Sequence, residues 1–328
     1  MSMTFLTYKS RLVGWTIAIL FSTIITSVSS ADTTKELLAS GHADEAIQAL
    51  EQKAKAPITD AESFNLLCRA YFMAEEWDKG ISACEHARDL DPNKSLYQLW
   101  LGRVYGEKAD RVNFISAAGL AKKVRVAFER AVELDPQSWE ARADLGEFYL
   151  EAPDFIGGGK DKAREQATAL MPLKPAKAYW LQGRIAEKDR DLTEAERQFR
   201  AGIAATNSGT RAWAELAIFF RHTNQYDAME KALRELENAP VDDHLALMDG
   251  ASLLVRTGRD PALGVRLVKR YFSVGTVEEG PAFKAHEYLG QLLEREGDHR
   301  GAADEYRAAL ALCRGYRRAE DGLKRVSR

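Results

Sequence analysis

The sequence predicts an all-α protein in which helical hairpins stack one on the next. Only 9 of its 328 residues are proline, and proline interrupts helix interiors. Apolar side chains recur at helical spacing, as at Phe64, Leu67 and Tyr71, which fall on one face of a helix. The same arrangement returns about every 34 residues, a period typical of stacked helical hairpins.

Composition excludes several classes of protein. With 45% hydrophobic and 29% charged residues, the chain is neither collagen-like nor disordered. Its 3 cysteines are too few for a disulfide scaffold. Lysine and arginine total 46 against 49 aspartate and glutamate residues, so charge predicts no nucleic-acid partner.

Residues 1–30 are expected to be a signal peptide. Lys9 and Arg11 precede an apolar run over 12–25 that is too short to span a bilayer comfortably. Small residues follow it, and we expect cleavage after Ser30 or Ala31. The mature chain is then periplasmic or secreted, with no membrane insertion. An uncleaved membrane anchor is the alternative.

The segment 61–94 shows the repeating unit most clearly. We number the places of a unit from its first residue, so Ala61 is place 1. Small residues at places 8, 20 and 27 allow two helices to approach closely, and large residues fill the space to the next unit. Pro92 ends the second helix. The residues that carry this pattern are Phe64, Leu67, Cys68, Tyr71, Gly80, Cys84 and Ala87.

This pattern resembles the tetratricopeptide repeat. Seven units in register follow a capping hairpin over 31–60, and a charged helix or tail occupies 317–328. The units cover 61–94, 95–138, 139–175, 176–209, 210–243, 244–277 and 283–316. The resemblance implies a right-handed solenoid of helical hairpins, whose concave inner surface is lined by the first helix of each unit.

Two insertions depart from the repeat, at 106–123 and 152–160. The first predicts a lengthened second helix that starts at Ser116 after a short loop. Because neighbouring turns share one edge of a solenoid, we expect the two loops to touch through Phe114 and Phe155. The edge is a candidate binding face, and a structural elaboration is the alternative. Its candidate residues are Arg111, Phe114, Phe155, Gly157, Gly158, Gly159 and Lys160.

The run from Gly157 to Lys160 permits two interpretations. Glycine amides before a helix can hold a phosphate or another anion. However, a phosphate-binding loop needs Ser or Thr after its lysine, and here Asp161 follows. A hairpin turn is therefore the favoured interpretation.

Motifs for catalysis, cofactors and metals are missing from the sequence. Its 6 histidines are scattered. The pair His286 and Glu287 begins like a zinc-protease motif, but Gly290 stands where the second histidine belongs. We therefore expect no enzyme, no catalytic residue, no cofactor and no metal site.

Cysteines 68 and 84 can meet across the first hairpin. They occupy places 8 and 24 of the unit 61–94, which face each other if the turn lies midway. Export would permit a disulfide between Cys68 and Cys84, and two core thiols are the alternative. Cys313 is left unpaired.

The resemblance also implies which side chains line the groove. Arginines there could hold an acidic or C-terminal segment, because Arg binds carboxylates through two hydrogen bonds. Further along, Leu245, Met248 and Val255 predict an apolar half suited to a hydrophobic ligand. A solvated face without a ligand is the alternative. The candidate groove residues are Arg69, Phe72, Leu99, Arg103, Trp180, Arg184 and Met248.

Together these features predict an exported, non-catalytic scaffold or adaptor that binds a protein or peptide in its groove. One alternative is a structural member of a cell-envelope complex. Another is an enzyme or small-molecule receptor built around the loops 106–123 and 152–160, for which a deep closed pocket would be expected.

Overall fold

The computed structural model describes residues 30–55 and 60–327, and this part of the chain is all-α. A single isolated bridge pairs Val277 with Gly280 within it. The helices are α1 Ser30–Ala39, α2 Ala43–Ala54, α3 Ala61–Met73, α4 Trp77–Leu90, α5 Ser95–Ala109, α6 Phe114–Leu134, α7 Trp139–Glu151, α8 Lys160–Leu170, α9 Pro175–Lys188, α10 Leu192–Ala205, α11 Thr210–His222, α12 Tyr226–Asn238, α13 Leu245–Thr257, α14 Pro261–Val274, α15 Ala282–Glu296, α16 His299–Leu312 and α17 Arg317–Val326.

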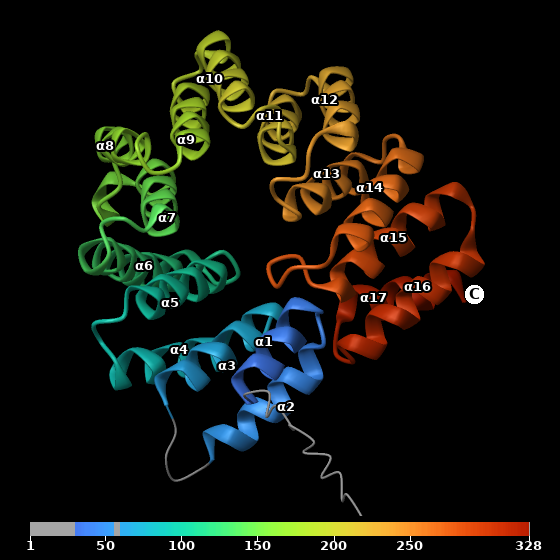
Figure 1. The fold of residues 1–328 in the computed structure, drawn as a ribbon, viewed down its shortest axis with the longest axis horizontal. Coiled ribbons are helices and arrows are strands. Elements are labelled where there is room, and N and C mark those ends of the chain that lie inside the picture. The colour runs from blue at the N-terminus through green and yellow to red at the C-terminus, as the bar shows by residue number, and fades with distance from the viewer. Residues whose placement is uncertain (1–29, 56–59, 328) are drawn as a thin grey trace, which may run out of the picture.

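The helices form antiparallel pairs that follow one another around an almost closed ring (Figure 1). From α7 to α14, the first helix of each pair lies on the inside of the ring and the second on the outside. Buried apolar residues from every pair join into one core cluster. The predicted all-α helical solenoid is confirmed.

Small residues let the two helices of a pair approach. A Cβ atom added at Gly102 of α5 would lie 2.4 Å from the Phe128 ring of α6. A Cβ at Gly183 would lie 2.9 Å from Phe199 in the same way. A glycine at place 8 therefore makes room for an aromatic ring at place 24. In α3 and α4 these two places hold cysteines.

Tyrosines at place 11 join consecutive pairs. The hydroxyl of Tyr149 on α7 donates to Glu129 on α6 at 2.9 Å, and Lys162 of α8 covers the ring with Nζ 5.2 Å from its centre. Burial and the neighbouring glutamate raise the pKa of Tyr149. Two other units repeat this arrangement with Tyr71, Glu51 and Lys79 and with Tyr105, Glu85 and Lys123.

The first insertion mainly lengthens α6, which has 21 residues. The expected start at Ser116 was wrong by two positions, since α6 begins at Phe114. Asn113 explains the difference, because its side chain accepts the Ser116 N–H at 3.1 Å and caps the helix earlier.

The second insertion forms a short 3₁₀ helix, η1 Asp154–Ile156, before α8. It reaches α6 through Gly157, where an added Cβ would lie 2.0 Å from Arg125 Nη1. The expected packing through two phenylalanines was wrong, since Phe114 is 75% exposed and Phe155 is 68% exposed. The second insertion therefore packs on α6 through Arg125, a residue just beyond the first insertion that the repeat pattern did not single out.

The two ends of the solenoid meet and close the ring (Figure 1). The Thr276 hydroxyl donates to the carbonyl of Ala39 at 2.8 Å. Arg314 Nε lies 2.9 Å from a carboxylate oxygen of Asp44. Gly41 packs against the backbone of Ala282 so closely that an added Cβ would lie 2.5 Å from its nitrogen. Contacts between the first helices and the last ones thus hold an arc of pairs as a ring.

The expected signal peptide lies largely outside the described residues, and α1 begins at Ser30. Across 30–55 and 60–327, every helix is too short or too polar to cross a membrane.

Candidate functional site

The three arginines predicted for the groove are all paired within the chain. Arg103 Nε on α5 lies 2.6 Å from Asp144 of α7. Arg184 on α9 contacts Glu147 at 3.2 Å and Glu151 at 2.9 Å. Arg69 holds both carboxylate oxygens of Glu278, with Nε 2.7 Å from Oε1.

Arginine side chains and aromatic rings alternate along this part of the inner face. The guanidinium groups of Arg69 and Arg103 both contact the Trp100 ring, 5.2 and 5.0 Å from its centre. Phe72 meets the same ring edge-on at 5.4 Å between centres. Leu99 is only 4% exposed, so this predicted groove residue belongs to the core.

The predicted apolar half of the groove is covered by the chain itself. Met248 is 3% exposed and Val255 is 7% exposed. The linker 275–281 lies over this face, and a Cβ added at Gly280 would lie 2.9 Å from Leu245 Cδ1 and 3.5 Å from Met248 Cγ. The prediction of an open hydrophobic surface here was therefore wrong, because an internal linker takes the place of a ligand.

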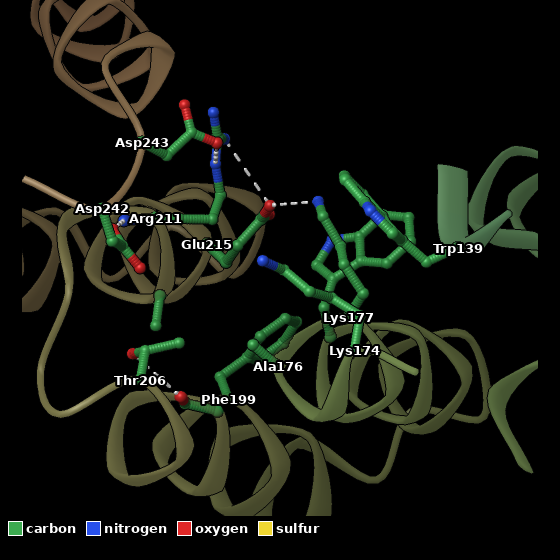
Figure 2. Close-up of a pocket in the computed structure, with 13 residues that line it drawn as sticks. Trp139, Lys174, Ala176, Lys177, Phe199, Thr206, Arg211, Glu215, Asp242 and Asp243 are labelled. Atoms are coloured by element: carbon green, nitrogen blue, oxygen red, sulfur yellow. Dashed lines mark hydrogen bonds and ion pairs between the residues drawn. The ribbon is translucent and has the colours of Figure 1, made fainter. Parts of the chain in front are cut away.

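A pocket of about 190 Å³ lies between α9, α10 and α11 (Figure 2). The start of α7 and the linker 239–244 complete its walls. Its lining residues are Trp139, Lys174, Ala176, Lys177, Trp180, Phe199, Gly202, Thr206, Arg211, Ala212, Glu215, Asp242 and Asp243.

Three aromatic rings and two lysines give the pocket its chemistry. Trp139, Trp180 and Phe199 supply the apolar walls. Lys177 Nζ lies 4.7 Å from the Trp180 ring centre and 3.4 Å from Glu215. Lys174 Nζ lies 5.4 Å from the Trp139 ring centre, and its side chain is exposed. In the described part of the chain, Lys174 has no carboxylate partner.

Arg211 fixes one wall of the pocket. Its guanidinium lies 2.8 Å from Asp243, 2.6 Å from Asp249 and 3.6 Å from Glu215. Burial alone would lower the pKa of Arg211, but these carboxylates outweigh it and raise that pKa. Burial raises the pKa of Asp249, whereas Arg211 holds the pKa of Asp243 below its ordinary value. The arginine therefore stays charged and is fully engaged.

The linker before α13 is fastened to the start of α11. Asp242 accepts the Thr210 hydroxyl and the Arg211 N–H, both at 3.0 Å. A carboxylate at this position satisfies a backbone donor at the helix N-terminus and opposes the positive end of the helix dipole. The pocket wall thus has defined geometry in the absence of a ligand.

Of the pocket residues, sequence reasoning identified only Trp180. Arg211 and Lys177 both stand at place 2 of their units, which the resemblance to the tetratricopeptide repeat puts on the inner surface, and this signal could have found them. Trp139 begins the first helix of the preceding pair and Phe199 lies on an outer helix, so only the packing shows that both rings reach this pocket.

At the edge loops, the charged and glycine residues are engaged locally. The N–H groups of Gly157, Gly158 and Gly159 donate to the carbonyls of Asp154, Pro153 and Tyr149. These amides are therefore occupied by the turn, and they do not face an anion. Lys160 pairs with Asp189. Arg111 contacts Glu107 at 2.6 Å and lies 4.4 Å from the Trp77 ring centre.

Cys68 and Cys84 are joined by a disulfide, with 5.1 Å between their Cα atoms. It takes the place that the Gly102 and Phe128 pair takes in the next unit. Cys313 is free and buried, and burial raises the pKa of its thiol to about 12. Within residues 30–55 and 60–327, no three His, Cys, Asp or Glu side chains gather as they would around a metal ion.

A known protein family is recognised in the last third of the chain. Residues 249–317 match the family model of the tetratricopeptide repeat. No curated protein sequence is significantly similar to the chain.

Several solved structures are similar to parts of the ring. A thermophilic tetratricopeptide repeat protein of Thermus thermophilus has 15% identity and a TM-score of 0.49, over 58% of this chain and 97% of that one. A tetratricopeptide repeat protein of Parabacteroides merdae has 14% identity and a TM-score of 0.38, over 82% of this chain and 99% of that one. The residues that match the repeat family, 249–317, begin within α13 and end at the start of α17.

Proposed function

We propose that the protein is an exported, non-catalytic scaffold that binds a peptide segment of a partner on the inner face of its ring. The observation that carries this proposal is the pocket between α9, α10 and α11, with its three aromatic rings and lysine rim. Binding surfaces commonly concentrate their affinity in one buried aromatic or aliphatic anchor that fills such a pocket.

The size of the pocket favours one side chain over a whole ligand. A space of about 190 Å³ is smaller than the cavities of about 300–1,000 Å³ that enclose drug-sized molecules. It suits one bulky apolar side chain that packs between Trp139, Trp180 and Phe199. The rest of the segment would then lie along the inner face.

The charges around the pocket favour an acidic neighbour for that side chain. Lys174 is exposed and has no carboxylate partner among the described residues, whereas Arg211 is fully paired. An aspartate, a glutamate or a C-terminal carboxylate beside the anchor would pair with Lys174. Arg184 lies 6.0 Å from the Trp180 ring centre, but Glu147 and Glu151 already pair with it, so among the described residues Lys174 is the cation left for the segment.

Export is supported by the disulfide and by the expected signal peptide. Disulfides persist in oxidising compartments such as the periplasm or the extracellular space. A buried disulfide between Cys68 and Cys84 fits such a compartment.

The test begins with a random-peptide phage library selected on the wild-type protein. We expect the selected peptides to share a bulky apolar residue next to an acidic one. Their fluorescein-labelled copies should bind about tenfold more weakly to Ala176→Phe, which fills the pocket, and several-fold more weakly to Lys174→Glu.

Lys231→Glu is the matched control. Lys231 is exposed on α12, away from the pocket, and the substitution changes the charge by the same amount as Lys174→Glu. It should bind the peptides as the wild type does. Peptides that bind Ala176→Phe and the wild type equally would contradict the proposal.

A further inference from the structure

Hydrogen bonds within residues 271–280 shape the linker 275–281, which then contacts the first helices at the closure of the ring. The buried hydroxyl of Tyr271 accepts the Val277 N–H at 2.7 Å and donates to the Gly280 carbonyl. A further hydrogen bond runs from the Gly280 N–H to the Val277 carbonyl at 3.1 Å. These bonds close a tight loop that projects Glu278 away from α14 and α15.

Glu278 is held as a ligand carboxylate would be held. It meets Arg69 of α3 through both carboxylate oxygens, a geometry that gives strong and directional pairing. Its side chain is only 10% exposed, and that of Arg69 is 21% exposed. Trp100 supports Arg69 from below, 5.2 Å from its guanidinium.

The surface that receives Glu278 was predicted for an external acidic segment. Asn65 lies one turn before Arg69 on the same face of α3. Its side chain is 1% exposed, and within the described residues Nδ2 has no acceptor. Among the described residues, Nδ2 of Asn65 is therefore an unsatisfied buried donor one helical turn from Arg69.

Several polar contacts hold the linker and its neighbours against the first helices. They include Thr276 with Ala39, Arg314 with Asp44, and Lys284 with Glu75 at 3.7 Å. Burial lowers the pKa of Lys284, so its charge is poorly compensated in the closed ring. The flanking ion pairs of Arg314 and Lys284 are partly exposed and contribute modestly to stability, so the pairing of Glu278 with Arg69 is the main contact that a competing acidic segment has to replace.

We propose that the linker 275–281 is an internal ligand, which closes the ring by occupying at Arg69 a site that also takes an acidic extended segment of another protein. A tethered ligand competes at a high effective concentration, so an external segment binds well only when the linker is released. This site is separate from the pocket at Trp180, and its test is independent of that pocket.

The probe is a fluorescein-labelled synthetic peptide that copies residues 275–281. Its binding is measured by fluorescence anisotropy, and the size of the ring by small-angle X-ray scattering. In Glu278→Lys the reversed charge leaves Arg69, so we expect probe affinity to rise about tenfold and the radius of gyration to increase.

Glu279→Lys is the matched control, because Glu279 is the exposed neighbour and the charge change is the same. It should behave as the wild type. The double variant Arg69→Glu with Glu278→Lys restores an ion pair of opposite direction, so it should close the ring again and lose the gained affinity. Glu278→Ala provides a milder release if Glu278→Lys folds poorly by circular dichroism.

Equal probe affinity in the wild type and in both Glu278 variants would overturn the proposal. An equal gain in Glu279→Lys would overturn it too, since the effect would then be one of net charge. Adding Ala176→Phe to Glu278→Lys should leave probe binding unchanged. Loss of binding there would assign the probe to the pocket, and would overturn the site at Arg69 while leaving the proposed function in place.

Discussion

Two stretches of the inner face are built from the same repeating helix pairs, but one contains an open pocket and the other is covered by a linker. Around α9 and α11 the short linkers 171–174 and 206–209 pass from one pair to the next, and a pocket remains beside Trp180. Around α13 and α15 the linker 275–281 folds inward and buries Met248. The helices alone therefore do not decide whether an inner surface is open, because the connections between pairs decide it.

The two stretches also differ in what fixes them. The open stretch is held by a buried charge network around Arg211. The covered stretch is held by hydrogen bonds from one tyrosine, Tyr271, to the linker. Breaking each device separately should show how far the two surfaces depend on them.

The largest effect is expected from Arg211→Gln. This change leaves Asp249 and Asp243 without their cation. Breaking a buried ion pair typically costs about 3–5 kcal/mol, and because solvent reaches both carboxylates we expect a loss of about 3 kcal/mol or less. Urea unfolding should show this loss of stability. Arg200→Gln is the control, because its pair with Glu196 lies on the surface, and it should cost under about 1 kcal/mol. A loss of the same small size for both variants would show that the pocket wall does not depend on Arg211.

Tyr271→Phe should have the next largest effect. It leaves the Val277 N–H and the Gly280 carbonyl without their partner, at a cost of about 2 kcal/mol. Thermal unfolding measures this cost, and we also expect faster hydrogen exchange over 275–281. Tyr226→Phe, which removes a hydroxyl bonded to Asn224 on the surface, should change little. Unchanged exchange in Tyr271→Phe would show that other contacts hold the linker.

Acid should weaken the open stretch through Asp243. Its pKa is lowered in the folded protein, so its stabilising effect is present above its unfolded pKa and is lost as the pH falls through the folded value. In Asp243→Asn the melting temperature should fall less between about pH 5 and pH 3 than in the wild type. We expect a difference of about 1 kcal/mol or less, because solvent screens this partly exposed carboxylate. Parallel acid profiles would contradict this assignment.

The smallest effect, and a favourable one, is expected from Gly202→Ala. An added Cβ would lie 3.7 Å from Tyr179 Cβ, an ordinary contact, and alanine favours a helix over glycine by about 0.5–1 kcal/mol. Differential scanning calorimetry should show a slightly higher melting temperature. The same change at Gly280, where the added atom would lie 2.9 Å from Leu245, should lower it. A gain at both positions would show that the linker tolerates displacement.

The repeat pattern predicted the fold because it records local packing. Gly102, Gly183 and Gly290 at place 8 each face an aromatic ring at place 24 of the same hairpin, and Cys68 bonds Cys84 there, so these pairs specify their own contact. Ring closure depends instead on contacts between residues more than 200 positions apart, such as Arg69 with Glu278. A pattern with a period of about 34 residues carries no information about them.

The candidate site was predictable only in part for the same reason. Arg69, Arg103 and Arg184 are at inner-face places, but their partners come from other units or from a linker. Their pairing could not be read from a single unit. The pocket at Trp180 combines four helices and three linkers, so its rings became visible only when the pairs were assembled.

The tyrosine contacts have a consequence for engineering. Each of the three joins residues 20 positions apart, a glutamate on the second helix of one pair and a tyrosine on the first helix of the next pair. The turn between the two helices of a pair does not lie between the bonded residues. Compared with the unit 61–94, the next two units have longer turns before Lys123 and Lys162. These lysines still contact the rings of Tyr105 and Tyr149. The turn at 110–113 should therefore accept an inserted reporter domain. The insertion would lie at the outer edge of the ring and leave the packing between consecutive pairs unchanged.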